Sequence, residues 1–402
     1  MEKHLFLHCG DLHLGCTPNH LEQRYEDFFI SFKDLIDNAI NFNCKYILIS
    51  GDLFHLKVIN SKTLLNVINL LEYARNNNIK VIAIEGNHDK AFYVDEESWL
   101  NFLNEKNYIT LLKHKINNGK LIIDNESIYE DDNIRIIGIG YLGSATSIYL
   151  KDIQNKISKS KKFTVLMMHA GINRLVGQEM GDISLEQLLP LKGLVDYVAL
   201  GHIHNKYILE DLFYNPGSIE NIRIKDGKRS DDKGYFIVSY QNKQKDVQFI
   251  KSKQRAIHNI QIKLENNLQI EEVERYLLNY DYSCEENAIL EITICGNVPF
   301  NPYLINFDYI KEALIKKYNL LYIDINNLIN IVTNEMNLTK IIDIKEIEET
   351  AIKDYLTINY PTLENNDEFT KSILTLKDAL IDEKEFDQII SLMLEKEDIL
   401  CD

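Results

Sequence analysis

The stretch VIAIEGNHD, residues 81–89, decides the fold class of this chain. It opens with four apolar residues, as a buried strand does. It ends in Gly86, Asn87, His88 and Asp89, of which the last three are residue types that rarely enter a core. The stretch therefore predicts a buried strand over residues 80–85 whose polar end serves a site.

Working outward, residues 1–255 alternate short apolar runs with amphipathic helical stretches, which is typical of a layered α/β fold. Strands are expected at 4–9, 46–50, 80–85, 134–140, 163–169, 197–201 and 234–240, and helices at 25–42, 61–77, 147–157 and 184–191.

Two further segments follow a boundary at KSKQRAIHN, residues 251–259. Residues 256–332 predict a small α/β domain, with strands at 259–264, 288–294 and 321–325 and helices at 270–280 and 307–318. Residues 333–402 predict an acidic helical tail, with helices at 343–356, 368–381 and 385–394. The expected domains are thus 1–255, 256–332 and 333–402.

Composition is that of an ordinary soluble globular protein, with 45% hydrophobic and 26% charged residues among 402. No apolar run reaches the roughly 18 residues of a membrane span, and no signal peptide is recognisable. The six cysteines are scattered, which favours reduced thiols and the cytoplasm. The net charge is −17, but residues 335–402 hold 18 acidic and 7 basic residues and so carry −11 of it. The acidity therefore weakens a nucleic-acid hypothesis without excluding it.

Polar side chains follow five of the expected strands at the point where each strand ends. Carboxyl ends of strands gather ligands in open α/β sheets, so we expect these side chains to converge. The candidate ligands are Asp11 and His13, then Asp52, Asn87, His169, and finally His202 and His204.

Oxygen and nitrogen donors without thiolate suit manganese, iron or zinc, and magnesium is a further option. The donors exceed the needs of one tetrahedral ion, which favours two metals bridged by one carboxylate. A glycine precedes several donors, where we expect it to allow a sharp backbone turn. These glycines are Gly10, Gly51, Gly86 and Gly201.

The order D-x-H, G-D, G-N-H-D, H, G-H-x-H over residues 4–240 resembles the calcineurin-like metallophosphoesterases. The resemblance implies a sandwich of two sheets flanked by helices. Within that superfamily, DLHLG, YILISGDLFH, AIEGNHD, ALGHIH and YNPGSIE are similar to the SbcD-type DNA repair nucleases, the bacterial counterparts of the MRE-type double-strand-break nuclease. The residues after 255 match that family's capping domain in position only.

Carried over position by position, the resemblance implies two divalent metals, with manganese favoured. Asp11, His13 and His204 would hold one metal, Asn87, His169 and His202 the other, and Asp52 would bridge them.

A phosphodiester also needs a proton for its leaving oxygen. We assign His88 as the general acid, oriented by Asp89. His55 is the second candidate, which the resemblance places facing the scissile phosphate or DNA end. The expected activity is hydrolysis of DNA at duplex ends, hairpins and single strands in double-strand-break repair.

The resemblance names an SbcC-type ABC ATPase as partner, for which the tail helices would suit docking, and it implies a homodimer. Phe29 is a candidate for the dimer contact, although core packing explains it equally well. DNA contact is expected from the basic cluster that contains Arg223, Lys225, Lys228 and Arg229. The alternatives are a phosphomonoesterase, a protein phosphatase, a cyclic-nucleotide phosphodiesterase, or a scaffold that binds DNA ends. Protein phosphatases of this class read G-D-x-x-D-R-G and G-N-H-E, whereas this chain reads GDLFHLK and GNHD.

Overall fold

The computed structural model describes residues 3–92, 97–172, 183–224, 233–265, 268–331, 344–359 and 366–381. The chain forms two compact units, Met1–Asn330 and Ile331–Asp402. Among the described residues, the first unit carries two large sheets, a three-stranded sheet and a two-stranded hairpin, and the second carries two helices.

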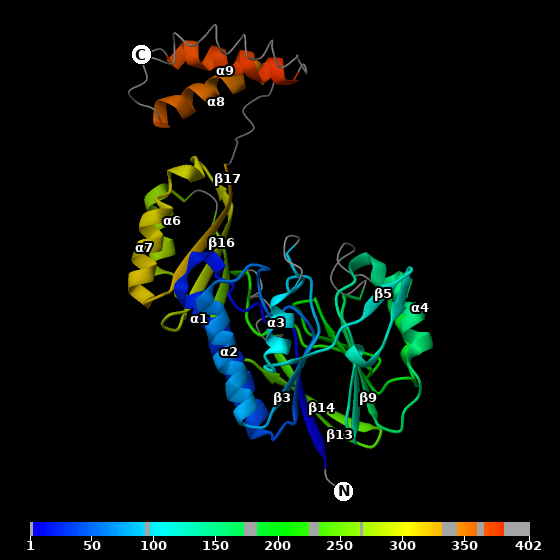
Figure 1. Ribbon diagram of the computed structural model, residues 1–402. Helices are drawn as coiled ribbons and strands as arrows, with labels where there is room; N and C mark the ends of the chain where they lie inside the picture. The colour runs from blue at the N-terminus through cyan, green and yellow to red at the C-terminus, as the bar shows by residue number, and fades with distance from the viewer. Residues whose placement is uncertain are drawn as a thin grey trace. The chain divides into compact units, whose positions relative to one another are not determined.

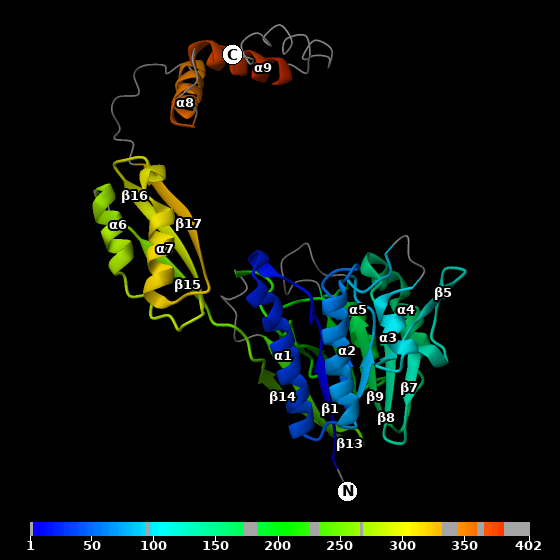
Figure 2. The ribbon, with the colours of Figure 1, turned by 60° about the vertical axis from the view of Figure 1, so that its left-hand side comes forward.

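The first large sheet has the strand order β14-β13-β1-β2-β3-β4. Its parallel part joins β1 (His4–Cys9), β2 (Tyr46–Ile49), β3 (Lys80–Ala83) and β4 (Thr110–Leu111). The antiparallel hairpin of β13 (Gly234–Gln241) and β14 (Gln244–Lys251) extends it past β1. Helices α1 (Glu22–Asn41) and α2 (Ser61–Asn76) lie side by side on one face (Figures 1 and 2), with α3 (Trp99–Glu105) nearby.

The second large sheet has the strand order β11-β12-β10-β9-β8-β7. Its central strands β8 (Ile134–Ile139), β9 (Phe163–His169) and β10 (Tyr197–Gly201) are parallel, as is β12 (Phe213–Asn215) beside β10. The edges are β7 (Ile128–Glu130) and β11 (Tyr207–Leu209), both antiparallel to their neighbours. Helices α4 (Thr146–Lys156) and α5 (Leu185–Leu188) pack on its outer apolar face, and β5 (Lys115–Asn117) and β6 (Lys120–Ile122) form a separate hairpin.

Alternation of side chains along the strands builds the layers. In β1, Leu5 and Leu7 face the α1 and α2 side, whereas Phe6 packs between the two sheets. Met167 of β9 and Ala199 of β10 meet Phe6 in the same inter-sheet core. Both faces of the central strands are buried, so these strands are mainly apolar, as parallel strands are. The predicted two-sheet sandwich flanked by helices is confirmed.

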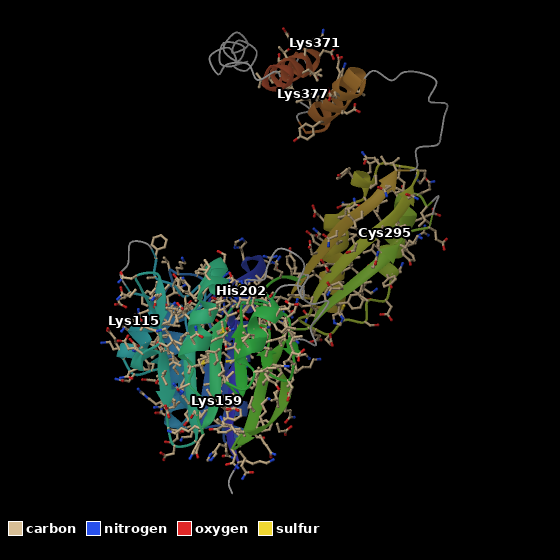
Figure 3. All side chains as sticks on the ribbon, turned by 90° about the vertical axis from the view of Figure 1, so that its right-hand side faces the viewer. Lys115, Lys159, His202, Cys295, Lys371 and Lys377 are labelled. Carbon is tan, nitrogen blue, oxygen red and sulfur yellow. The ribbon has the colours of Figure 1, made fainter. Side chains whose placement is uncertain are left out.

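The parallel register places the carboxyl ends of five strands at one end of the sandwich. β1, β2 and β3 run together in one sheet, and β9 and β10 run together in the other. Figure 3 labels His202, just after β10, at the end opposite Lys159, which precedes β9. Every candidate ligand therefore lies at this end.

A three-stranded sheet with its own apolar core occupies the rest of the first unit. It contains β15 (Ile257–Lys263), β16 (Ile289–Val298) and β17 (Tyr322–Ile331), with α6 (Ile270–Asn279) and α7 (Phe307–Tyr318) on one face (Figure 2). The division at residue 255 stays a prediction. Arg255 joins the two parts, because it donates to both carboxylate oxygens of Asp27 at 2.7 Å and to the Asn287 carbonyl at 2.7 Å.

The second unit contains α8 (Ile344–Asn359) and α9 (Asn366–Ile381), which overlap the first two helices predicted for the tail. The third, at 385–394, lies outside the described residues. Within the described ranges, no helix has the length and apolar character needed to cross a membrane.

Candidate metal centre

Asp11, His13 and His204 form one group of donors at the carboxyl end of the sandwich. A carboxylate oxygen of Asp11 and a ring nitrogen of each histidine lie within 4.8 Å of one another. The Nε2 atoms of His13 and His204 are 3.1 Å apart. The three residues follow β1 and β10, which belong to different sheets, so the sandwich itself brings them together.

Asn87, His169 and His202 form a second group. The amide oxygen of Asn87 lies 3.1 Å from His169 Nε2 and 3.1 Å from His202 Nδ1. The Nδ1 atom of His169 lies 2.6 Å from the Ser50 carbonyl, to which it donates a hydrogen bond. This bond fixes the tautomer that leaves Nε2 free to act as a ligand, the usual arrangement for a metal-binding histidine.

Asp52 lies between the two groups. Its Oδ2 is 3.4 Å from His169 Nε2 and 3.8 Å from His13 Nε2, while its Oδ1 accepts the backbone N–H of His88 at 2.9 Å. The Asp52 side chain is only 2% exposed. The structure thus brings all seven predicted ligands together, with the one carboxylate that faces both groups at the centre.

Asp11 shows the clearest sign that a cation belongs here. Its Oδ1 accepts the backbone N–H of His202 at 3.0 Å, but its Oδ2 is buried and has no partner among the described residues. A buried carboxylate oxygen without a partner costs several kilocalories per mole unless a cation or donor satisfies it. Oxygen and imidazole donors without thiolate fit Mn²⁺, Fe²⁺ or Zn²⁺.

The charges of the centre are strongly coupled. Burial opposes ionisation of Asp52, but the charge and hydrogen bond of His169 outweigh it and hold the pKa of Asp52 below its usual range. Burial likewise disfavours charge on His169, but Asp52 raises the pKa of that imidazole to about 9. Burial raises the pKa of Asp11 to about 7. Without a metal, Asp52 is thus ionised and the His169 imidazole carries the proton beside it. A bound cation would occupy this place and neutralise the charge of the carboxylates.

The backbone at the centre is conformationally unusual. Asp11, His13, Asp52 and His202 all have positive φ values, between 44° and 84°. Side chains rarely adopt this region, and such residues cluster at functional sites. Strain is therefore concentrated on four of the seven candidate ligands.

Of the four glycines expected to allow sharp turns, the structure gives only Gly51 a positive φ, of 93°. The prediction of a conformational role is wrong for Gly86, where the constraint is space. A Cβ on Gly86 would lie 2.0 Å from Asp52 Oδ1. Gly86 is therefore required because the β3 loop passes against the central carboxylate.

His88 and His55 lie beside the first group, and their rings stack with centroids 5.6 Å apart. A ring nitrogen from each of His13, His55 and His88 falls within 4.8 Å of the others. The Nδ1 atom of His88 donates to the His55 carbonyl at 2.6 Å, so its other nitrogen can face a substrate.

The prediction that Asp89 orients His88 is wrong. Both carboxylate oxygens of Asp89 accept backbone N–H groups, from Gly86 at 3.0 Å, Leu53 at 3.2 Å and Phe54 at 3.0 Å. Asp89 therefore ties the β3 loop to the β2 loop, and the His55 carbonyl is the partner that orients His88.

Two residues at the centre were missed from the sequence. Buried Lys233 donates to the His204 carbonyl at 2.7 Å and holds that loop in place. The ring of Tyr141 lies against His169 and His202, with centroid distances of 5.8 and 5.3 Å. Tyr141 follows the apolar strand β8, as the ligands follow theirs, but a tyrosine is not a typical metal ligand and was not considered. Lys233 precedes β13, so its position after a strand gave no signal.

The predicted DNA-binding cluster is only partly described. Arg223 is exposed, whereas Lys225, Lys228 and Arg229 lie outside the described residues. Phe29, the candidate for the dimer contact, is 7% exposed and belongs to the core that α1 and α2 share with the first sheet.

Comparison with known proteins finds relatives over most of the chain. The DNA double-strand break repair protein Mre11 of Sulfolobus acidocaldarius is 27% identical over 80% of this chain and 84% of its own length. The protein of the same name from Archaeoglobus fulgidus is 24% identical over 97% of this chain and 84% of its own. That from Methanocaldococcus jannaschii is 32% identical over 60% of this chain and 64% of its own. Among solved structures, a dimetal phosphatase from Danio rerio aligns over 62% of this chain and 97% of its own with 9% identity and a TM-score of 0.38, too low to add to the argument.

The family model for calcineurin-like phosphoesterases matches residues 4–206. That range is just over half of the 402 residues and includes every candidate ligand from Asp11 to His204. The unpartnered oxygen of Asp11 and the shared carboxylate of Asp52 fit the pair of divalent metals that this family implies. The chain belongs to the calcineurin-like phosphoesterase family and is a metal-dependent phosphodiesterase.

Proposed function

We propose that this phosphodiesterase is a DNA nuclease of double-strand-break repair that uses two divalent metals, with manganese preferred. The observation that carries the proposal is the convergence of six donors around Asp52 at the carboxyl end of the sandwich. The relatives named as Mre11 support DNA repair as the setting, and they share sequence over most of the chain.

Each ligand has a proposed place. Asp11, His13 and His204 hold one ion, Asn87, His169 and His202 hold the other, and Asp52 contacts both. Bound divalent ions supply charge that stabilises a phosphorane-like transition state and acidify the attacking water. The protein's contribution is a rigid frame, because Ser50 fixes the His169 ring and Lys233 fixes the His204 loop.

His88 is the proposed general acid. Its ring is held by the hydrogen bond from Nδ1 to the His55 carbonyl, so a proton on Nε2 can pass to the departing oxygen of the DNA strand. His55 stacks on this ring and borders the same space as His13, which suits contact with the substrate strand.

The proposed partners are DNA, an SbcC-type ABC ATPase and a second copy of the chain. Helices α8 and α9 form a unit separate from the enzyme domain, as an element that docks onto a partner could. Apolar side chains remain exposed on the helix pair next to the first sheet: Ile30 is 46% exposed and Leu65 is 59% exposed. These two side chains are our candidates for the contact between two copies of the chain. Substituting both by glutamate should shift the protein to monomer in light-scattering measurements.

The decisive experiment is digestion of end-labelled duplex, hairpin and single-stranded DNA with added manganese, alone and with the ATPase. Cleavage by the wild-type protein that is lost on Asp52→Asn substitution supports the proposal. Hydrolysis of a phosphopeptide or a cyclic nucleotide, with all three DNA substrates left intact, would assign the chain to another branch of the family. Binding of DNA ends without cleavage would indicate a scaffold.

A further inference from the structure

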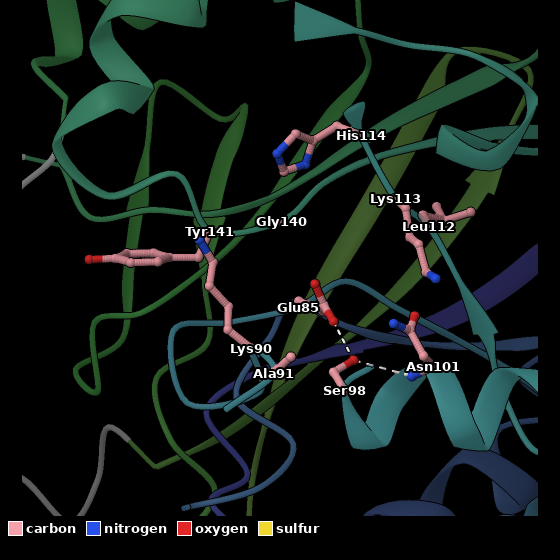
Figure 4. A pocket seen from close by; sticks show the side chains of 10 residues that line it. All are labelled: Glu85, Lys90, Ala91, Ser98, Asn101, Leu112, Lys113, His114, Gly140 and Tyr141. Atoms are coloured by element: carbon pink, nitrogen blue, oxygen red, sulfur yellow. Dashed lines mark hydrogen bonds between the residues drawn. The ribbon is translucent and has the colours of Figure 1, made fainter. Parts of the chain in front are cut away.

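A pocket of about 400 Å³ lies beside the metal centre and has no role in the chemistry described above (Figure 4). Four separate segments of the chain line it. Lys90 comes from the β3 loop, Asn101 from α3, and Lys113 and His114 follow β4. Tyr141 closes one side, and its ring also contacts His169 and His202 of the centre. The pocket and the metal centre therefore share a wall.

The pocket gathers positive charge. Lys90 and Lys113 line it, and among the described residues no carboxylate lies within ion-pair distance of either ammonium. The nearest acidic lining residue is Glu85, whose carboxylate accepts the Ser98 hydroxyl at the helix cap (Figure 4). Two ammonium groups that lack a carboxylate partner within the described ranges attract an anion to the cavity, and lysine is a common phosphate ligand.

Two further groups in the pocket have unused hydrogen-bonding capacity. The amide oxygen of Asn101 is buried and has no partner among the described residues. The His114 ring is partly buried, and burial together with the charge of Lys90 lowers the pKa of that imidazole to about 4. It is therefore neutral at pH 7 and can donate one N–H. Buried polar groups normally find partners, so a pocket with several unmatched ones is adapted to a polar ligand.

We propose that this pocket binds a phosphate of the DNA strand beyond the phosphate that is cleaved. This inference rests on the proposed nuclease function and deepens it. Lys90, Lys113 and His114 contact the phosphate oxygens, and the Asn101 oxygen accepts a hydrogen bond from the attached nucleoside. A strand that enters through this pocket is positioned at the metals by a phosphate that does not react. The pocket thus favours a polynucleotide over a substrate with a single phosphate.

The test compares a substrate that has further phosphates with one whose only phosphate is the one that is cleaved. Steady-state kcat/KM is measured for a single-stranded oligonucleotide and for bis(p-nitrophenyl) phosphate, with the full chain and manganese. In Lys113→Gln and His114→Gln, the ratio of the two kcat/KM values should fall by about tenfold, which is typical of losing one hydrogen bond to a charged group. The loss should arise from a higher KM for the oligonucleotide.

Matched variants control for charge and folding. Lys115→Gln removes the same charge two residues along, but Lys115 pairs with Asp124 and Glu126 outside the pocket and lies on the hairpin away from His202 (Figure 3). The ratio of the two kcat/KM values in Lys115→Gln should equal that of the wild type. Lys113→Arg keeps the charge, so its ratio should be closer to that of the wild type than to that of Lys113→Gln. Thermal melting shows whether each variant is folded.

A second readout needs no catalysis. Trp99 is the single tryptophan of the chain, and it follows Ser98 of the pocket at the start of α3. Its fluorescence can follow binding of an oligonucleotide in the presence of a chelator. Lys113→Gln should weaken this binding and reduce the slope of log K against log salt by about one.

The outcomes separate the two proposals. If the wild-type protein hydrolyses bis(p-nitrophenyl) phosphate but neither binds nor cleaves DNA, the nuclease proposal is overturned, and the subsite with it. If DNA is cleaved but the ratio is the same in Lys113→Gln, His114→Gln and Lys115→Gln, the subsite alone is overturned.

Discussion

Replacing Gly86 by alanine tests whether the loop after β3 sets the position of Asp52. The added Cβ would lie 2.0 Å from Asp52 Oδ1 and 2.4 Å from the Asp52 backbone nitrogen. Ordinary van der Waals contact begins near 3.4 Å, so the carboxylate and the loop must separate by about 1.4 Å. Asp89 ties this loop to the backbone of Leu53 and Phe54, which leaves little room for the loop to move away.

The displacement falls on the carboxylate that faces both groups of ligands. Misplacing a reacting group by about 1 Å can cost roughly 100-fold in rate. We therefore expect kcat/KM of Gly86→Ala to fall by at least about 100-fold, equivalent to about 2.7 kcal/mol of transition-state stabilisation. Stabilisation by the metal should weaken too, because an ion that binds only the native state stabilises it by an amount that grows with the logarithm of the ion concentration divided by Kd.

The assay is manganese-dependent hydrolysis of bis(p-nitrophenyl) phosphate, together with the rise in melting temperature on adding manganese. Gly10→Ala is the matched control. Gly10 directly precedes the ligand Asp11, but its added Cβ would meet no atom nearer than 3.5 Å. Gly10→Ala should behave like the wild type. Equal activity and equal manganese stabilisation in the two variants would refute the reasoning.

The remaining predictions concern proton transfer, a buried ion network and a buried histidine. His88→Gln should keep its manganese stabilisation and lose roughly 10²–10⁴-fold in kcat on DNA. It should lose less on bis(p-nitrophenyl) phosphate, whose leaving group needs no proton, so equal losses on both substrates would contradict the assignment. Asp27→Asn should lower the free energy of unfolding in urea by about 3–5 kcal/mol, because it leaves buried Arg24 and half-buried Arg255 without their shared carboxylate. Asp37→Asn, which removes an exposed pair with Lys33, should change it by less than about 1 kcal/mol. Burial lowers the pKa of His8 to about 3, so below pH 6.5 the unfolded state binds a proton that the folded state does not. Stability should therefore fall as the pH drops from 6.5 toward 3, with a slope of up to about 1.4 kcal/mol per pH unit from this group, and His8→Gln should show a flatter dependence.

The ligands could be predicted because each follows a strand that the sequence marks plainly. Strands such as β1, β9 and β10 are buried on both faces for most of their length, so they are mainly apolar and the polar residues at or just after their carboxyl ends stand out. Short elements gave no such signal. β4 has only two residues, and in β14 exposed side chains alternate with half-buried ones.

Other parts of the site depend on backbone geometry that residue types do not reveal. Asp89 stands beside His88 in the sequence, which suggested that it orients the ring, yet its oxygens point back to backbone N–H groups of the β2 loop. The anion pocket joins Asn101 of α3 with Lys90, Lys113 and Tyr141 of three separate loops. Only the packing of the sandwich brings them together, so no local pattern could have predicted it.

The most direct test of the metal centre is a crystal structure of the manganese-loaded protein with anomalous scattering measured at the manganese edge. The account predicts two anomalous peaks that share Asp52. One should be bound by Asp11, His13 and His204, and the other by Asn87, His169 and His202. A single peak, or a peak held by His55 and His88 in place of these ligands, would contradict it.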